Sequence, residues 1–441
     1  MAGGLMQLVA YGAQDVYLTG QPKVTFFQAV YKRHTNFAME NIQQTVNGTP
    51  SNSGRVSVTI ARNGDLVGNM YVALQPTATL VANLTSNDTR YDSSWVAERA
   101  IAAVELTIGG QRIDKHYQAW FRLYSEVFLN EADKINYGKL TSSPVANDST
   151  NKNYVYLPLL FFFNRNPGLY LPLIALQYHE VRLDFDLTSG FTNYFGASSQ
   201  VFEVWANYVY LDTEERRRFA QKGHEYLIEQ VQHTGGDSIT ATSQTVRLSF
   251  NHPVKELIWC YQNTTSTSQN SMWNFSTAAA NCQVTVNPLA NVVAAACIQI
   301  TPHTVGSPRL LSNATVGSQN YWIEEGSAPA SGAFEVGPLR DFKLVLNGQD
   351  RFKEQFGKYF NQYQPYVYHC GVPYPGIYMY SFALKPEELQ PSGVCNFSRI
   401  DMAQISVNLK TGMPALNQHM FAVNYNILRV QSGLGGLAFS N

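Results

Sequence analysis

Residue pairs that could support acid–base or metal chemistry stand close together in the segment HEVRLDFD at residues 179–186. His179 and Glu180 begin like a zinc-protease motif, but the position four residues after His179 is Leu183, so the second histidine ligand is missing. Asp184 and Asp186 would share one face of a strand, and paired carboxylates can serve glycoside hydrolysis. We favour a hydrated strand face as the interpretation of this pair.

Other groupings lack the spacing that catalysis or metal binding requires. No GxSxG nucleophile motif occurs, and the spacing of Cys282, Cys297 and His303 matches no metal motif. His116 directly follows an Asp-Lys pair, which is more typical of a turn histidine than of a catalytic base. We therefore expect no enzymatic activity, no metal and no cofactor.

The composition restricts the class of partner. Only 14% of the 441 residues are charged, against about 25% in an ordinary protein, and the formal net charge is −1. A surface so poor in charge suits close lateral packing of subunits, whereas direct nucleic-acid binding would need a basic field. The 5 cysteines form no CxxC pair and are odd in number, which indicates free thiols in a reducing compartment rather than a disulfide framework.

The beginning of the sequence, MAGGLMQLVAYGAQD, lacks the basic start and apolar core of a signal peptide. The strongest apolar runs, at 155–163 and 289–300, are shorter than the roughly 20 residues that span a bilayer. These features predict synthesis in the cytosol, without membrane insertion.

A stretch of the first half recurs in the second half. Residues 104–121 read VELTIGGQRIDKHYQAWF, and residues 342–360 read FKLVLNGQDRFKEQFGKYF. Each begins as an alternating strand, breaks at a glycine turn, continues with glutamine and arginine, and ends on a phenylalanine. Gly-Gly and Asn-Gly supply the positive φ angles of a tight hairpin turn, so the shared residues have a mechanical explanation.

The flanking chain repeats in the same order. Alternating strand patterns precede and follow both copies, and the partners are 55–66 with 245–259, 179–187 with 396–409, and 201–212 with 420–430. A repeat unit near 200 residues is too long for a solenoid or a propeller blade. The pattern predicts two copies of one whole domain.

Many short strands separated by Gly, Asn, Pro and Ser turns predict an all-β sandwich or barrel in each copy. We divide the chain into an N-terminal arm at 1–24, a first domain at 25–212, a linker at 213–223 and a second domain at 224–441. The linker carries a run of self-paired charges, EERRR at 214–218. The second domain contains a long Ser/Thr/Asn/Ala-rich insertion at about 264–340, which is typical of a surface tower or functional loop.

Within this division we predict several individual elements. Residues 24–42 should lead into the first domain as a strand, and residues 116–134 should contain a helix. The run YLPLLFFF at 156–163 should be a fully buried strand, and 171–185 should be another long strand that carries His179 and Glu180 on opposite faces. The end of the sequence, 433–441, should be a flexible tail able to lodge against a neighbouring molecule.

Six stretches together resemble one protein family. They are MAGGLMQLVAYGAQDVYLTG, IGGQRIDKHY, LPLIALQYHEVRL, LNGQDRF, YSFALKPEELQPSGVCNFSRID and NYNILRVQSGLGGLAF. Together they resemble the major capsid protein family of nucleocytoplasmic large DNA viruses, and most of all its algal (phycodnavirus, chlorovirus-like) members. The insertion at about 264–340 resembles the family least.

The resemblance implies a fold and an assembly. The fold is all-β, with two consecutive eight-stranded jelly rolls, each a Greek-key β-sandwich, and short helices in the loops. The implied partners are two further copies in a homotrimeric capsomer of pseudo-hexagonal outline, neighbouring capsomers of the icosahedral outer shell, and minor capsid proteins contacted by the arm. Direct contact with nucleic acid is not implied. The insertion loops would project outward from the virion.

Glycosylation is a further implication, since algal members carry glycans at unusual sequence contexts. Sequons occur at Asn47, Asn83, Asn87, Asn147, Asn263, Asn274, Asn313 and Asn396, and without a signal peptide they read as unmodified polar loop residues. By position, we expect Asn274, Asn313 and Asn396 to be the asparagines that carry covalent N-linked glycans.

Two other functions remain open at this point. A jelly-roll lectin or polysaccharide-active enzyme would need a cleft with clustered acids and exposed aromatics. The available tyrosines fit strand and interface positions better: Tyr366, Tyr368, Tyr374, Tyr378 and Tyr380. A minor or penton capsid protein would usually carry a single jelly roll, whereas a lesser paralogue of the main shell protein stays possible.

Overall fold

The computed structural model describes most of the chain, and it divides this chain into two compact units, 1–37 and 38–441. The insertion predicted at about 264–340 lies almost wholly outside the described residues. The described residues are 3–10, 12–76, 80–81, 91–92, 95–142, 154–196, 201–263, 275, 337–371, 373, 376–413 and 415–439.

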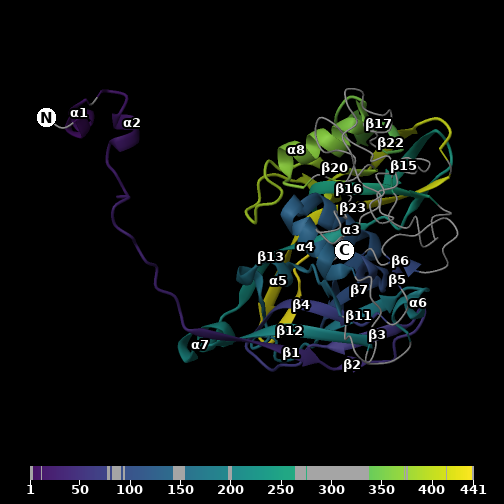
Figure 1. The fold of residues 1–441 in the computed structure, drawn as a ribbon, viewed down its shortest axis with the longest axis horizontal. Helices are drawn as coiled ribbons and strands as arrows, with labels where there is room; N and C mark the ends of the chain where they lie inside the picture. The colour runs from purple at the N-terminus through teal and green to yellow at the C-terminus, as the bar shows by residue number, and fades with distance from the viewer. Residues whose placement is uncertain are drawn as a thin grey trace, which may run out of the picture. The chain divides into compact units, whose positions relative to one another are not determined.

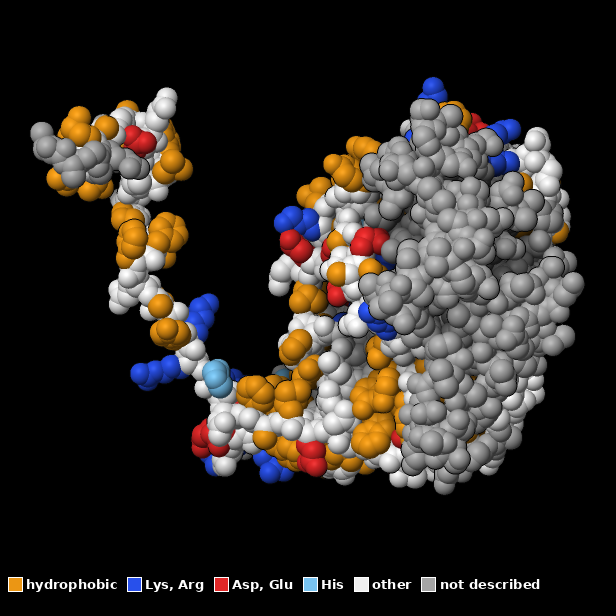
Figure 2. Space-filling view, viewed as in Figure 1, with side chains coloured by type: hydrophobic (Ala, Val, Ile, Leu, Met, Phe, Trp, Pro, Cys, Tyr) orange, Lys and Arg blue, Asp and Glu red, His pale blue; other side chains and the backbone are white. Residues whose placement is uncertain are grey.

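The first unit consists of two short helices and a strandless segment. The helices are α1 (Gly3–Val9) and α2 (Val16–Thr19). Hydrophobic side chains along this unit are exposed, Phe26 and Phe27 among them (Figure 2). The strand predicted at 24–42 is therefore wrong over most of its length, since β1 begins only at Phe37. The strand starts where the chain gains a hydrogen-bonding partner, β12.

Two antiparallel sheets form the first jelly roll (Figure 1). One has the order β1-β12-β4-β10, with β9 also paired to β4, and the other has the order β2-β3-β11-β7-β8. The strands of the first sheet are β1 (Phe37–Gln44), β4 (Leu66–Leu74), β9 (Val155–Pro158), β10 (Leu171–Pro172) and β12 (Phe202–Leu211). Those of the second are β2 (Val46–Asn47), β3 (Arg55–Thr59), β7 (Ile101–Ile108), β8 (Gln111–Tyr117) and β11 (Val181–Leu187). A short parallel pair, β5 (Leu80–Val81) and β6 (Tyr91–Asp92), stands apart from both.

Two further antiparallel sheets form the second jelly roll. The larger has the order β13-β23-β16-β20, with β14 and β24 on β23 and β21 on β16, and the smaller has the order β15-β22-β17-β18, with β19 on β17. The strands of the larger sheet are β13 (His224–His233), β14 (Asp237–Ile239), β16 (Pro253–Asn263), β20 (Ile377–Ser381), β21 (Cys395–Asn396), β23 (Leu416–Gln431) and β24 (Leu434–Leu437). Those of the smaller are β15 (Ser243–Leu248), β17 (Leu339–Leu346), β18 (Gln349–Asp350), β19 (Gln355–Phe356) and β22 (Ala403–Leu409).

Short helices occupy the connections between the strands. In the first jelly roll they are η1 (Val96–Arg99), α3 (Gln118–Phe128), α4 (Glu131–Thr141), α5 (Phe162–Arg165), η2 (Pro167–Leu169) and α6 (Phe191–Phe195). The segment predicted as a linker folds as α7 (Thr213–Gln221). In the second jelly roll they are the π-helical turn η7 (Tyr359–Tyr363), α8 (Gln364–Tyr368) and η8 (Phe397–Arg399).

The predicted duplication is confirmed by the strand orders. The order β1-β12-β4-β9 in the first jelly roll corresponds to β13-β23-β16-β20 in the second, and β3-β11-β7-β8 corresponds to β15-β22-β17-β18. The predicted turns also match, because Gly109, Gly110, Asn347 and Gly348 have φ angles of 57°, 81°, 49° and 77°. Each pair joins two strands as a two-residue hairpin, the arrangement that needs positive φ at both positions.

Each jelly roll has a core between its two sheets. In the first, Phe185 of β11 meets Phe202 of β12 with ring centroids 5.3 Å apart. In the second, Trp259 of β16 stacks on Phe342 of β17 at 4.6 Å. Each contact joins opposite sheets, so alternate residues of every long strand point inward and the others point outward. The outward faces are therefore what each jelly roll presents to its surroundings.

Two predicted strands of the first jelly roll are wrong. The run at 156–163 is a strand only in β9 and then enters α5, whose Asn164 donates to the carbonyl of Gly68 in β4 at 2.8 Å. The segment at 171–185 is two strands, because β10 pairs with β4 in one sheet and β11 pairs with β3 and β7 in the other. The chain crosses between sheets here, which a single straight strand cannot do.

Candidate functional site at the junction of the two jelly rolls

Helix α3 of the first jelly roll lies against the outer face of the larger sheet of the second jelly roll (Figure 1). Trp120 and Leu123 are buried there with Phe421 of β23, and the Trp120 and Phe421 rings are 5.4 Å apart. Phe121, on another side of the helix, belongs to the core of the first jelly roll. The helix thus binds both domains, and we call the contact surface between them the junction.

A buried ionic cluster holds α3 to its own domain. The guanidinium of Arg122 lies 2.9 Å from Glu126 and 3.6 Å from Glu98, and it also covers the Trp95 ring at 3.8 Å. Lys134 of α4 lies 3.5 Å from Glu126. Two carboxylates and two cations thus balance one another, which a site shielded from water requires.

Burial determines the protonation of this cluster. It raises the pKa of Glu98 to about 7, although the neighbouring Arg122 acts in the opposite direction. The hydroxyl of Tyr137 donates to Glu98 at 2.8 Å. Burial, together with the charge of Glu98, also raises the pKa of Tyr137, so this phenol stays a hydrogen-bond donor at physiological pH.

A second polar group closes the junction at the end of α3. His369, which follows α8, contacts Glu256 of β16 at 2.8 Å and Glu387 at 3.1 Å. Burial alone would lower the pKa of His369, but the two carboxylates outweigh it and raise that pKa to about 9. The imidazole ring also meets Phe128 of α3 edge-on at 4.8 Å, and the thiol of Cys370 donates to the Phe128 carbonyl at 3.3 Å.

An ion pair crosses the junction directly. Arg165 of α5 in the first jelly roll lies 3.0 Å from Glu229 of β13 in the second. Lys255 of β16 lies 2.5 Å from the same carboxylate and also donates to the Pro386 carbonyl at 2.8 Å. Burial would raise the pKa of Glu229, but the two cations outweigh it and lower that pKa, so the carboxylate stays ionised.

The C-terminal hairpin forms a further contact across the junction. The prediction of a flexible tail is wrong for residues 433–439. The amide of Tyr178 donates to the carbonyl of Gly433 at 3.0 Å, and a ring nitrogen of His179 lies 2.8 Å from the Gly435 carbonyl. Gly433 has a φ of 81°, and a Cβ there would lie 2.5 Å from the Tyr178 ring. Only glycine fits this turn.

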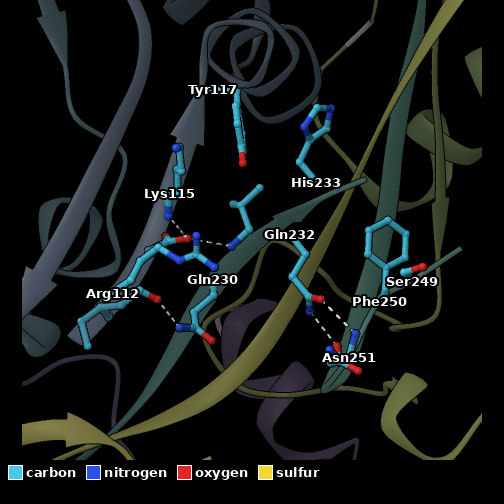
Figure 3. Close-up of a pocket in the computed structure, with 12 residues that line it drawn as sticks. Arg112, Lys115, Tyr117, Gln230, Gln232, His233, Ser249, Phe250 and Asn251 are labelled. Carbon is cyan, nitrogen blue, oxygen red and sulfur yellow. Dashed lines mark hydrogen bonds between the residues drawn. The ribbon is translucent and has the colours of Figure 1, made fainter. Parts of the chain in front are cut away.

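A cavity of about 220 Å³ opens between β8 of the first jelly roll and β13 of the second (Figure 3). At its wall, the side chain of Gln230 donates to the Ile113 carbonyl, and the amide of Val231 donates to Asp114 at 3.1 Å. Burial and the nearby His419 lower the pKa of His233 to about 4, so its imidazole is neutral at physiological pH.

The cavity has the character of a polar seam between domains. Two of its charged side chains already have partners, since Asp114 contacts His116 at 2.9 Å and Lys115 contacts Glu105 at 3.7 Å. Among the residues that the structure describes, no group of three potential ligands could hold a metal ion. In the same part of the chain, no helix is long and apolar enough to cross a membrane.

Of the three predicted glycosylation sites, only Asn396 is described. It is exposed at the end of β21, where its Oδ1 accepts from the amide of Ser398 at 3.1 Å. That bond uses Oδ1 and not Nδ2, and Nδ2 is the atom to which an N-linked glycan attaches. Asn274 and Asn313 lie outside the described residues.

Among the described residues, those with catalytic potential do not form a site, and Cys282, Cys297 and His303 lie outside the described residues. Asp184 and Asp186 share a face of β11, but Asp184 is buried and paired with Arg55 at 3.3 Å and with Arg182 at 2.6 Å. Its face of the strand is therefore ion-paired, not simply hydrated as predicted. His179 lies in the loop before β11, where it binds the C-terminal hairpin, and not within a strand.

Sequence reasoning missed the buried charged residues at and beside the junction. Arg122 and Glu126 are four positions apart in a segment that was predicted to be helical, and that spacing is the signal that could have found them. Glu98, Glu256 and His369 come from distant parts of the chain. Nothing in their local sequence shows that they are buried together.

Two family models match the chain. Residues 25–212 match the model "Major capsid protein N-terminus", and residues 215–436 match "Large eukaryotic DNA virus major capsid protein". The chain is 43% identical over 484 residues to the major capsid protein of Paramecium bursaria Chlorella virus 1, with 100% of both chains covered. It is 39% identical over 523 residues to the major capsid protein of Phaeocystis pouchetii virus, again with 100% of both covered.

Solved structures are similar over nearly the whole chain. The crystal structure of PBCV-1 VP54 has a TM-score of 0.72 to this chain at 38% identity, covering 95% of this chain and 100% of that one. The Faustovirus major capsid protein has a TM-score of 0.66 at 12% identity, with 97% and 96% covered, so it is similar in fold.

Proposed function

The chain belongs to the major capsid protein family of large eukaryotic DNA viruses, and on this premise we propose that three copies assemble into a capsomer of pseudo-hexagonal outline. Such capsomers would tile the outer icosahedral shell of the virion. The role is structural, without catalysis, metal or cofactor.

One observation supports this proposal above all: the two jelly rolls have the same strand order and are held together by a buried junction. Three copies bring six similar domains together, so a trimer can occupy a position of near-sixfold symmetry. The junction matters because a flexible pair of domains would not present a constant outline. Apolar packing along α3 and the ion pair between Arg165 and Glu229 both resist rotation of one jelly roll against the other.

The native mass of the purified protein tests this proposal. We expect light scattering to find a species of three times the 49.3 kDa chain mass that persists on dilution. Obligate interfaces of this kind bury about 2,000–5,000 Å² or more, which makes dissociation negligible at ordinary concentrations. A protein that stays monomeric at every concentration would contradict the trimer.

The first unit is proposed to bind minor capsid proteins beneath the shell. Its exposed hydrophobic side chains, which include Phe26, Phe27 and Tyr31, support this, because a partner would remove them from water (Figure 2). Deleting residues 1–37 should then leave trimers intact but prevent co-assembly with those partners. Synthesis is proposed to occur in the host cytoplasm.

Covalent N-linked glycans are proposed at Asn274, Asn313 and Asn396. Exposure of Asn396 supports the third site. Peptide mass spectrometry of protein from virions tests each site separately, and an Asn396→Gln variant should lose one glycan mass. Unmodified peptides covering all three asparagines would overturn the assignment.

A further inference from the structure

The outer face of the larger sheet in the second jelly roll is an apolar surface covered by a helix. Phe421, Ile258 and Met379 form one row across β23, β16 and β20, because Ile258 pairs with both of the others. Trp120, Leu123 and Val127 of α3 are buried with this row. The contact shows which element of one jelly roll fits the outer sheet face of the next.

The corresponding face of the first jelly roll carries aromatic side chains. Trp205, Tyr71 and Pro158 form a row across the corresponding strands β12, β4 and β9, and Tyr156 stands in the next row. Tyr71 and Tyr156 meet edge-on at 5.6 Å, and Tyr154 stacks on Tyr156 at 6.3 Å. We call Tyr71, Tyr154, Tyr156 and Trp205 the aromatic face.

The side chains of the aromatic face are less buried than Ile258, Met379 and Phe421 of the second jelly roll, which are fully buried. All four of its aromatic side chains remain partly exposed, and none belongs to a buried hydrophobic cluster of the described residues. Its hydrogen bonds are local: Asn41 donates to the Tyr71 hydroxyl at 3.1 Å, and the Trp205 indole donates to Glu203 at 3.0 Å. Tyrosine and tryptophan of this kind are enriched at interfaces, since each combines apolar area with a polar group.

The counterpart of α3 in the second jelly roll is the helical segment formed by η7 and α8. Phe360 enters the core of the second jelly roll as Phe121 enters the core of the first. Aligning these two phenylalanines places Tyr363, Tyr366 and Val367 opposite Tyr124, Val127 and Phe128 of α3. The α3 residues pack at the junction, whereas Tyr363, Tyr366 and Val367 are 56%, 85% and 47% exposed.

We propose that η7 and α8 of one copy pack on the aromatic face of a second copy, as α3 packs on the second jelly roll within the chain. The proposal rests on the trimer proposed above and identifies its contact surfaces. The contact joins different surfaces of the two copies, so it propagates from copy to copy. Contacts of this type close into a ring when the rotation between copies is suitable. In a ring of three copies, the three junctions within the chains alternate with three similar contacts between the chains.

A pair of variants tests this contact in the full-length protein. Tyr366→Glu combined with Val367→Glu would place two carboxylates against the aromatic face, so the concentration for half-dissociation should rise about 100-fold or more. Met402→Glu alters another exposed hydrophobic residue of the same jelly roll and should leave the trimer unchanged. Circular dichroism of the dissociated protein should match the wild type, which excludes misfolding as the cause.

A rescue sharpens the test and separates the two proposals. Adding Tyr156→Lys to the double variant should restore at least part of the lost affinity, because the lysine of one copy would face the glutamates of the next. If the wild type is a trimer and the variant with Tyr366→Glu and Val367→Glu is also a trimer, the proposed contact is wrong but the trimer is supported. A wild-type monomer overturns the trimer itself.

Discussion

The two jelly rolls have the same strand order but differ in the side chains on one outer sheet face. In the second, Ile258, Met379 and Phe421 are covered by α3 within the chain. In the first, Tyr71 and Trp205 form a row on the corresponding face and stay partly exposed. A face buried during folding can be wholly apolar, whereas a face that meets water before assembly benefits from hydroxyl and indole groups. Duplication of a fold therefore does not duplicate its surface chemistry.

Charged side chains also differ in burial between two helices of the chain. Arg122 of α3 is buried between Glu98 and Glu126, whereas Arg217 of α7 forms an exposed pair with Glu214 at 3.4 Å. The first arrangement leaves uncompensated buried charge when one partner is removed, and the second leaves charge that water can solvate.

The largest effect should come from this buried cluster. Arg122→Leu should destabilise the protein by about 3–5 kcal/mol, because two buried carboxylates lose their shared partner. Arg217→Leu should change the free energy of unfolding by no more than about 1 kcal/mol. Urea denaturation of both variants measures the difference, and equal effects would show that the cluster near α3 is not shielded from water.

The next effect concerns the apolar contact at the junction. Leu123→Ala should cost about 2–5 kcal/mol, since the side chain is wholly buried between α3 and the second jelly roll. Leu384→Ala, at an exposed leucine of the second jelly roll, should stay within about 0.5 kcal/mol. Thermal unfolding that separates into two transitions in Leu123→Ala alone would sharpen the assignment to the junction.

A pH effect should follow from His369 at the end of α3. Its pKa is raised from 6.5 to about 9 in the folded protein, so its stabilising contribution is complete below pH 6.5 and is lost as the pH rises through 9. The loss for wild type should be at most roughly 3 kcal/mol between these pH values. Denaturant midpoints at pH 6.5 and 9 measure it, and His369→Gln should lack this component. A slope unaltered in the variant would contradict the pairing with Glu256.

The smallest effect should be that of salt on the assembled trimer. If apolar and neutral aromatic surfaces hold the copies together, trimers should persist in about 1 M NaCl at neutral pH, where ion pairs between exposed groups are strongly screened. Light scattering at low and high salt checks this. Dissociation at high salt would mean that charged groups, and not the aromatic face, dominate the contact between copies.

Much of the fold could be predicted because its signals are local. The turns at Gly109-Gly110 and Asn347-Gly348 need positive φ, and alternation along 403–409 requires only that one face be buried. The stretch at 171–185 failed because its residues pair with two different sheets. Its apolar composition is the same in either arrangement.

The sequence by itself determined that the chain is a duplicated, all-β protein of the capsid family, because turn residues, strand periodicity and family motifs are properties of short segments. Only the tertiary structure decided which of those segments form the junction. Arg122, Glu98 and His369 acquire their roles from burial beside partners distant in sequence, and burial is what gives a charge its energetic weight. For the same reason, only the structure distinguished the covered face of the second jelly roll from the aromatic face of the first.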